Sequence, residues 1–468
     1  MTRLRAMTKK KAQIRTTKED FVNYSSKLRK EFTRLTISPG DRISFVDEKK
    51  SIEGHILEQN ELGDPNAILI KMDNGYNIGI QFSLTATIRK MTGRVELESF
   101  PIRIPQQKSG LPEISLLATG GTIASRIDYQ TGGVVMAMQP EEIFASLPEL
   151  FDEVSFKSVK SLFSMGSEDM NFRQWRIIAE ESFNELNSGV QGVVITHGTD
   201  IMGYSAAALS FMLQDLISPI IITGAQRSSD RGSYDGAINL ISATRAAAKA
   251  DIASVMICMH ETSSDDTCLL TLGTKVRKMH TSRRDAFRPI NDRALARIDM
   301  AGKITELQEN LPRRNEGNMN LQTGYNDKVT LIKIFPGISP DVLDWYIDKG
   351  TPGVIIEGTG LGHVPTFTPS KENRSWIPSF ERTIDEGIFV GMTSQCLYGR
   401  VHPFVYKALR TSYQVGVTFL QDMLPETALI KLGWTLGNYN DPEEIRRLMV
   451  NNLAGEINSL SKFAEFLI

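Results

Sequence analysis

The fold is decided where an apolar run meets a glycine-rich loop, in Ile114-Ser115-Leu116-Leu117-Ala118-Thr119-Gly120-Gly121-Thr122. The first residues predict a buried strand and the glycines predict a sharp turn. The pattern recurs in Val193-Val194-Ile195 before Thr196-His197-Gly198-Thr199-Asp200, and in Ile220-Ile221-Ile222 before Thr223-Gly224-Ala225. Amphipathic stretches at 171–187 and 203–216 separate these runs. The alternation predicts an α/β fold with a parallel sheet and helices on both faces.

A second α/β region follows towards the C-terminus. Its strand candidates are Val329–Phe335, Gly353–Glu357 and Ile388–Met392. A polar stretch rich in Asn, Pro and Gly near residues 305–328 separates it from the first region. We therefore expect two α/β domains, at residues 113–310, which carry the active site, and at residues 325–468.

The part of the chain before residue 113 has a different character. Residues 37–92 predict a small β-barrel domain, because short apolar runs alternate with turns and Asp73-Asn74-Gly75 is a strong hairpin signal. Residues 93–112 predict a linker. Residues 1–36 form a basic extension with 11 Lys or Arg against 3 Asp or Glu. Such an extension either contacts RNA or stays solvated and partly disordered.

Composition restricts the class of protein. With 468 residues, 41% of them apolar and 23% charged, the chain predicts a multidomain globular protein. The three cysteines show no C-x-x-C spacing, which argues against a disulfide framework or a zinc site. The charged N-terminus lacks an apolar signal segment, and no run of about 18 apolar residues predicts a membrane span. A cytoplasmic location is expected.

The two threonine-rich loops carry the candidate chemistry. Ligands of open α/β sheets bind at the carboxyl ends of strands, so Thr122, Thr199 and Asp200 are expected to meet in one crevice. The glycines leave backbone N–H groups free to bind an oxyanion. Glycine pairs after strands also form phosphate cradles, but the chain lacks G-x-x-x-x-G-K-[ST] and has no G-x-G-x-x-G in a suitable context.

Four ordered segments resemble the L-asparaginase family. Residues 118–124 and 196–200 resemble its two threonine signatures, and Gly166-Ser167-Glu168-Asp169-Met170 resembles its substrate-binding segment. Lys278, within Val276-Arg277-Lys278-Met279-His280-Thr281, stands where the family keeps a catalytic lysine. The resemblance covers roughly residues 113–468 and implies an asparaginase-like, two-domain fold.

The resemblance also implies a threonine nucleophile and an acyl-enzyme mechanism. It makes Thr122 the nucleophile, and makes Thr199, Lys278 and Asp200 the group that activates the attacking hydroxyl or water. Lys278 also stands in a basic run, where most lysines are simply solvated.

The remaining implied residues bind the substrate. Backbone N–H groups near Gly121 and Thr199 would hold the oxyanion. Ser167 and Glu168 would bind the amino and carboxylate end of the substrate, and Tyr129 would be a mobile-loop tyrosine. Glu168 stands where the family often has Gln, and it could instead be a plain surface acid.

Further segments resemble the D subunits of archaeal glutamyl-tRNA(Gln) amidotransferases, a branch of this family. They are residues 224–231, 278–287 and 422–428, together with the leading barrel. The resemblance implies a glutamine-hydrolysing chain that forms a homodimer within a heterotetramer, together with a partner called the E subunit. It implies no cofactor in this chain, since ATP and Mg would bind the E subunit, which also engages most of the glutamyl-tRNA(Gln). The alternatives are a stand-alone asparaginase or glutaminase and an inactive scaffold.

Overall fold

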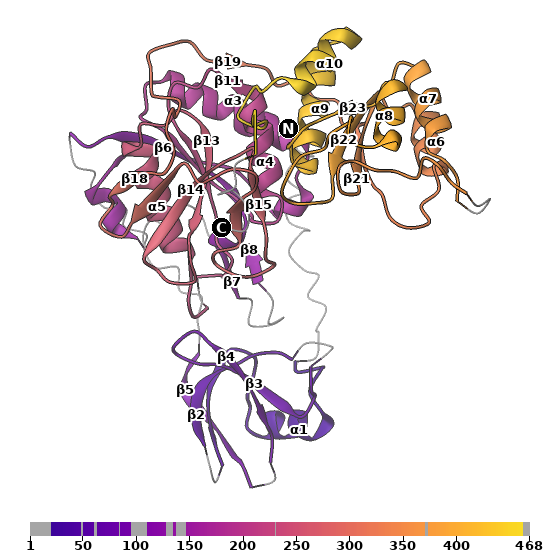
Figure 1. The fold of residues 1–468 in the computed structure, drawn as a ribbon. Helices are drawn as coiled ribbons and strands as arrows, with labels where there is room; N and C mark the ends of the chain where they lie inside the picture. The colour runs from indigo at the N-terminus through magenta and orange to yellow at the C-terminus, as the bar shows by residue number, and fades with distance from the viewer. Residues whose placement is uncertain are drawn as a thin grey trace, which may run out of the picture. The chain divides into compact units, whose positions relative to one another are not determined.

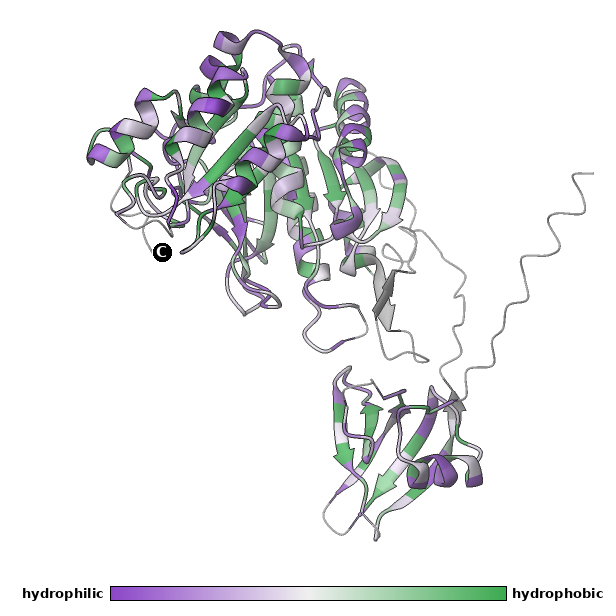
Figure 2. Ribbon diagram, turned by 90° about the vertical axis from the view of Figure 1, so that its right-hand side faces the viewer, coloured by the Kyte–Doolittle hydropathy of each residue, from purple (hydrophilic) through white to green (hydrophobic). Residues whose placement is uncertain are grey.

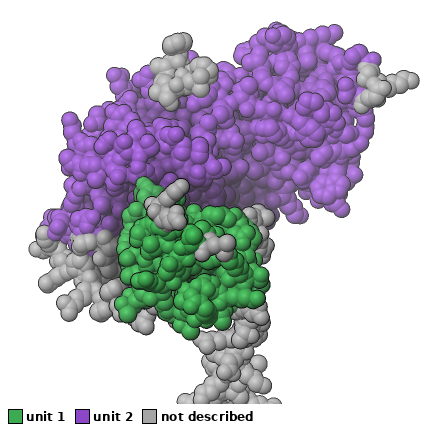
Figure 3. All heavy atoms as spheres, turned by 90° about the horizontal axis from the view of Figure 1, so that it is seen from below, with its two compact units in different colours: residues 1–101, 126–135, 230–233 green, residues 102–125, 136–229, 234–468 purple. Residues whose placement is uncertain are grey.

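The computed structural model describes residues 20–47, 50–59, 63–83, 85–94, 110–127, 134–136, 147–229, 231–369 and 373–461. Its contacts divide the chain into two compact units (Figure 1, Figure 3). The smaller unit holds residues 1–101, 126–135 and 230–233, and the larger unit holds the rest.

The main sheet of the smaller unit is antiparallel, in the strand order β4-β3-β2-β1-β5. Its strands are β1 (Asp41–Val46), β2 (Ser51–Ile56), β3 (Ala67–Lys71), β4 (Asn77–Gln81) and β5 (Thr87–Arg94). The expected hairpin joins β3 to β4. Gly75 takes a φ of +85° there and its N–H donates to Met72 O over 2.9 Å, so the tight reversal needs a residue without a Cβ atom.

A helix completes the core of this unit. Helix α1 (Ser26–Arg34) begins after Ser25, whose hydroxyl accepts from Leu28 N. Its buried Leu28 and Phe32 pack with Phe21 and Tyr24 into the apolar cluster beneath the sheet. The basic extension expected over residues 1–36 therefore joins the core of the small unit from Phe21 onward. Residues 1–19 lie outside the described ranges.

The larger unit is built on an eight-stranded sheet in the order β18-β17-β14-β13-β12-β10-β6-β9. Strands β9, β6, β10, β12 and β13 pair in parallel, as the sequence predicts. Their bounds are β6 (Glu113–Gly120), β9 (Ser155–Met165), β10 (Val193–Thr196), β12 (Ile220–Thr223) and β13 (Val255–His260). In the register, Thr196 pairs with Ala118 on one side and with Thr223 on the other, so the three polar loops begin at one edge of the sheet.

The other end of this sheet is antiparallel, which makes the sheet mixed. It contains β14 (Thr267–Leu272), β17 (Ala296–Asp299) and β18 (Ile304–Glu306). Only six residues separate β13 from β14, too few for the crossover that a parallel neighbour requires. Six short strands form three separate two-stranded pairs, β7-β8, β11-β19 and β15-β16. Their bounds are β7 (Ser125–Ile127), β8 (Val134–Met136), β11 (Leu213–Gln214), β15 (Val276–Lys278), β16 (Phe287–Pro289) and β19 (Asn320–Leu321).

Alternate strand residues supply two cores, one on each face of the sheet. Val194 and Ile221 pack with helix α5 (Gly236–Lys249). Val193 and Ile195 pack with helices α3 (Phe172–Asn187) and α4 (Met202–Met212). Figure 2 shows the green, apolar strands inside and purple residues on the surrounding helices. The short helical turns are η1 (Thr122–Ala124), η2 (Pro148–Asp152) and η3 (Ser167–Asp169).

The C-terminal α/β domain has a four-stranded parallel sheet in the order β20-β21-β22-β23. Its strands are β20 (Thr330–Lys333), β21 (Gly353–Gly358), β22 (Phe389–Ser394) and β23 (Thr418–Phe419). Helices α6 (Asp341–Asp348), α7 (Ile377–Asp385) and α8 (Lys407–Gln414) cover one face, and α9 (Pro425–Asn438) and α10 (Pro442–Val450) cover the other. Within the described ranges, no helix combines the length and apolar composition that crossing a bilayer requires.

Candidate functional site

The first two threonine loops touch through their backbones. Gly120 and Gly121 end β6 with φ values of +101° and +83°. A Cβ atom on Gly121 would lie 2.5 Å from Gly198 N, so the two loops approach as closely as backbones can. Thr122 follows at once as the first residue of η1 and is half-buried. The structure thus brings Thr122 beside the loop that carries Thr199 and Asp200.

Lys278 lies at the end of β15 and reaches the second threonine loop. Its Nζ donates to Thr199 Oγ1 over 2.9 Å and to Asp200 Oδ1 over 2.8 Å. Thr199 is 7% exposed and the side chain of Lys278 is 15% exposed, whereas Asp200 is 64% exposed. A lysine held this way can exchange a proton with the Thr199 hydroxyl while the carboxylate stabilises its charged form. Lys278 is therefore half-buried, and its Nζ is hydrogen-bonded to two side chains.

The candidate substrate-binding residues lie partly at the same place. Ser167 is buried, and its Oγ is 2.7 Å from where a Cβ on Gly198 would stand, so it packs against the second loop. Glu168 follows it in η3 and is exposed. Its carboxylate folds back over Gly166. Tyr129 lies outside the described residues.

Buried polar side chains hold the strand ends in place. Thr119 Oγ1 donates to Thr196 O over 2.8 Å, and Thr223 Oγ1 donates to Cys258 O over 2.9 Å. His197 is completely buried, which lowers its pKa to about 4 and keeps it neutral near pH 7. Its Nδ1 lies 2.6 Å from Gly198 O, so the ring supports the loop backbone.

The segment that carries Lys278 is tied to the C-terminal domain, which the sequence interpretation did not foresee. Lys275 forms an ion pair with Asp422 at 2.7 Å, with both side chains at most 1% exposed. Arg277 pairs with Glu426 at 3.0 Å. Thr427 Oγ1 donates to Thr274 O over 3.0 Å. The sequence signal that could have indicated these ties is the group of charged residues in 422–428. That segment was noted for its resemblance, but no role was predicted for it.

Arginines near Lys278 are also held by carboxylates. Arg283 pairs with Asp285 at 2.8 Å, and Arg284 pairs with Asp265 at 2.5 Å. The Arg283 contact holds the pKa of the Asp285 carboxyl below its usual range. The charges around the lysine are therefore largely matched.

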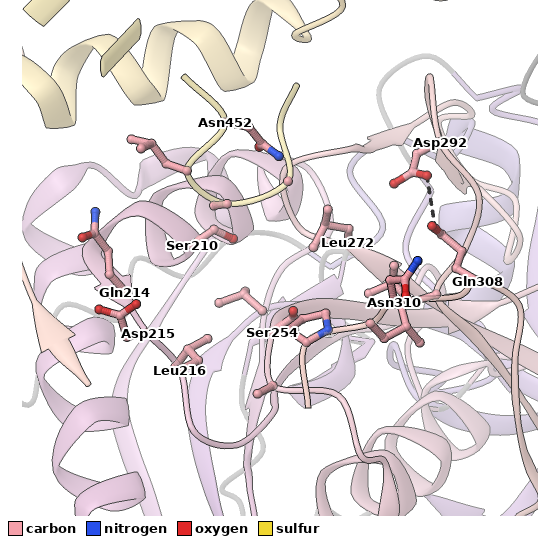
Figure 4. A pocket seen from close by; sticks show the side chains of 18 of the residues that line it. Ser210, Gln214, Asp215, Leu216, Ser254, Leu272, Asp292, Gln308, Asn310 and Asn452 are labelled. Atoms are coloured by element: carbon pink, nitrogen blue, oxygen red, sulfur yellow. Dashed lines mark hydrogen bonds between the residues drawn. The ribbon is translucent and has the colours of Figure 1, made fainter. Parts of the chain in front are cut away.

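Two cavities in the larger unit differ in their relation to this site. One of about 160 Å³ lies directly beside the lysine and is lined by Asp200, Gly203, Tyr204, Val276, Arg277, Lys278, Glu426 and Thr427. Burial and then Glu426 raise the pKa of Tyr204 to about 12, so its hydroxyl stays protonated. A larger one of about 490 Å³ (Figure 4) is lined by Ser254, just before β13, and by Asn452. None of the candidate catalytic residues lines this larger cavity. The smaller cavity belongs to the site because Asp200 and Lys278 line it.

Comparison with known proteins agrees with this architecture. Three family models match: GatD N-terminal domain over residues 37–91, Asparaginase, N-terminal over residues 113–312, and Glutaminase/Asparaginase C-terminal domain over residues 328–449. The glutamyl-tRNA(Gln) amidotransferase D subunit of Thermococcus kodakarensis is 46% identical over 93% of this chain and 98% of its own length. The Pyrococcus furiosus protein of the same name is 48% identical over 92% and 98%.

Solved structures of asparaginases share the fold of the larger unit. The thermostable L-asparaginase from Thermococcus kodakarensis has a TM-score of 0.66 and 30% identity, covering 74% of this chain and all of that protein. L-asparaginase I from Vibrio cholerae has a TM-score of 0.64 and 28% identity, covering 74% and 99%. The asparaginase-type core, the preceding small domain and the near full-length similarity together show that the chain belongs to the family of glutamyl-tRNA(Gln) amidotransferase D subunits.

Proposed function

We propose that this chain hydrolyses glutamine and supplies the ammonia for converting glutamyl-tRNA(Gln) to glutaminyl-tRNA(Gln). The observation that carries the proposal is the Nζ of Lys278, hydrogen-bonded to Thr199 and Asp200 beside the Gly121–Thr122 loop. A hydroxyl is a weak nucleophile at its own pKa and needs such a neighbour.

In the proposed reaction Thr122 is the nucleophile. Its Oγ forms a bond to the side-chain amide carbon of glutamine, and its proton passes through the Thr199 hydroxyl to the unprotonated amine of Lys278. Backbone N–H groups near Gly121 and Thr199 stabilise the oxyanion. The carbon–nitrogen bond then breaks, and the nitrogen leaves as ammonia with the proton returned from the pair.

Water completes the cycle. The Thr199, Lys278 and Asp200 group takes a proton from water as the water oxygen attacks the acyl carbon. The bond from that carbon to Thr122 Oγ then breaks, glutamate leaves, and the group returns the proton to Thr122 Oγ. Ser167 and Glu168 bind the amino-acid end of the substrate, and Tyr129 is assigned to substrate binding with them. The buried position of Ser167 against Gly198 supports this assignment.

The amidation itself is assigned to a partner. We propose a homodimer of this chain within a heterotetramer whose other component, the E subunit, binds ATP, Mg and most of the glutamyl-tRNA(Gln). The similarity to named D subunits supports this assembly. The three cysteines are free thiols, which suits a reducing cytoplasm.

A stand-alone asparaginase or glutaminase is the second candidate, favoured by the likeness of the larger unit to enzymes named L-asparaginase. The match of residues 37–91 to the GatD N-terminal domain favours the amidotransferase.

Steady-state glutamine hydrolysis distinguishes the two candidates. It is measured for the chain alone, with the E subunit, and with glutamyl-tRNA(Gln) added. A dedicated ammonia donor should be slow alone and should gain about a hundredfold in the full complex, which corresponds to roughly 2.7 kcal/mol of transition-state stabilisation. Equal and fast turnover in all three mixtures would leave the stand-alone hydrolase.

A further inference from the structure

A buried histidine lies behind the site with oxygens at both ring nitrogens. His260, the last residue of β13, has no exposed surface. Its Nδ1 is 2.6 Å from Asn239 Oδ1 and its Nε2 is 3.2 Å from Asp265 Oδ1. A neutral imidazole has one N–H and can donate to only one of them.

The contacts of Asn239 fix which end of its amide faces the histidine. Its Nδ2 donates to Gly224 O over 2.9 Å and to Asp235 Oδ2 over 3.2 Å. The amide oxygen must then face His260 Nδ1, which has to carry a proton. The Asp265 carboxylate only accepts, so Nε2 has to carry one as well. These contacts are complete only when His260 is an imidazolium.

The contact of His260 with Asn239 supports the loop that carries Thr199. Gly224 follows β12, and Asn239 holds its carbonyl oxygen. A Cβ on Gly224 would lie 2.4 Å from His197 O and 3.3 Å from Thr199 Cγ2. The backbone that Asn239 holds therefore packs directly against the second threonine loop.

The contact of His260 with Asp265 supports the β15–β16 hairpin, which carries Lys278 and is called the Lys278 hairpin below. Asp265 Oδ1 also binds Arg284 Nη1 at 2.5 Å, and Arg284 donates to Ser263 O. Arg284 lies in the turn between β15 and β16, which is closed by Met279 N donating to Ala286 O over 2.7 Å. One cation thus joins the two segments whose side chains meet in the Thr199–Lys278 hydrogen bond.

We propose that His260 is a positioning residue, doubly protonated in the working enzyme, that holds the Thr199 loop and the Lys278 hairpin at hydrogen-bonding distance. The part of the inference that concerns turnover rests on the proposed glutaminase function. His260 touches neither substrate nor reacting atoms in this scheme and acts through Asn239 and Asp265.

The surroundings determine how this arrangement responds to pH. Among the described residues, Asp235, Asp265 and the Cys268 thiol act on the ring, while Arg284 pairs with Asp265 and the Cys258 thiol contacts Cys268. Burial opposes the charged ring, but contacts with Cys268, Asp265 and Asp235 outweigh it and raise the pKa of His260. The arrangement is therefore complete below that raised pKa and is lost as pH rises through it.

The charge of the ring can be measured without any activity assay. In the full chain labelled with ¹⁵N-histidine, NMR should show protons on both ring nitrogens of His260 near pH 7. His280 is the internal control, because its Nδ1 accepts from Ser282 N and Arg283 N, both at 3.1 Å, and so carries no proton. A single N–H on His260 would overturn the inference.

Kinetics then test the positioning role with two matched variants. Asp265→Asn keeps an oxygen that accepts from Nε2 but removes the negative charge of Asp265. The pKa of His260 should then fall, and the alkaline limb of kcat should move to lower pH by about one unit. Asp266→Asn removes an equal charge at the next exposed position and should leave the limb in place. Unchanged limbs in both variants would overturn the role of His260.

Cys268→Ala separates the histidine from the neighbouring thiol. It should move the alkaline limb of kcat to lower pH as well, because contact with Cys268 is the largest of the influences that raise the pKa of His260. A limb that moves with Cys268→Ala and stays fixed with Asp265→Asn would assign the titration to the thiol and refute the inference. Absence of glutamine hydrolysis in the wild-type complex would instead refute the proposed function, while the ring-nitrogen measurement still decides the charge of His260.

Discussion

Replacing Gly121 by alanine tests whether contact between the two threonine loops sets the rate. The new Cβ would lie 2.5 Å from Gly198 N and 2.6 Å from Gly198 Cα. Both distances are roughly 1 Å inside the optimal separation of about 3.5 Å for non-bonded atoms. Both neighbours are backbone atoms, so the loops must separate by a similar amount. The φ of +83° adds a strain of about 1 kcal/mol for a residue with a Cβ.

We expect kcat for glutamine hydrolysis to fall about 100-fold, because a 1 Å displacement of reacting groups has roughly that effect. The free energy of unfolding should fall by only about 1–2 kcal/mol, since the loops lie at the edge of the sheet. Ammonia release under substrate saturation measures the first quantity and urea unfolding the second. KM should change less than kcat if the displacement acts on the reacting atoms.

Gly189→Ala is the matched control. Gly189 has a φ of +91°, but an added Cβ would meet nothing within 4 Å. It should show the same strain in the unfolding experiment and leave kcat unchanged. If Gly121→Ala turned over glutamine as fast as this control, the contact between the loops would not position the nucleophile.

Four other changes have defined outcomes. Thr122→Val should lose about 10⁴-fold or more in glutamine hydrolysis with the fold intact, and a variant that kept a tenth of the rate would exclude this nucleophile. Lys278→Arg should be nearly as inactive as Lys278→Ala, with a loss of about 10³-fold, since a guanidinium cannot give up its proton; an active arginine variant would show that only charge is needed. Asp422→Ala should lower the free energy of unfolding by about 3–5 kcal/mol, because it leaves Lys275 charged and buried, whereas Lys275→Met with Asp422→Leu should recover most of it in the same urea titration. Since the pKa of His197 is lowered to about 4, the wild type should lose about 3 kcal/mol more stability than His197→Asn as pH falls from 6.5 to 4.

The sequence predicts the elements whose signal is local. The apolar runs before the glycine loops became β6, β10 and β12, and the amphipathic stretch at 171–187 became α3 (Phe172–Asn187). The stretch at 203–216 ended earlier, at Met212, because Leu213 and Gln214 pair with β19 across the chain. The antiparallel edge of the main sheet was not foreseen, since a six-residue turn between β13 and β14 sets the strand direction and apolar content does not.

The residues of the candidate site likewise fall into those that a local sequence pattern predicts and those that it does not. Thr122, Thr199 and Asp200 follow from glycine-rich loops at strand ends, a pattern readable in a few residues. Lys278 was found only through resemblance, because nothing local distinguishes it from its basic neighbours. The Lys275–Asp422 contact joins residues 147 positions apart, and such pairing depends on the packed fold.

The ties between β15 and the C-terminal domain limit how this protein can be divided or recombined. All the side chains proposed to act on glutamine precede residue 313, which suggests a self-sufficient catalytic module. A fragment ending there would carry the lysine yet lack Asp422 and Glu426, the anchors of its strand. In a hybrid with a C-terminal domain from another protein, that domain would have to supply carboxylates at the positions of Asp422 and Glu426. The two α/β domains are therefore expected to evolve, and to be exchanged, as one inherited piece.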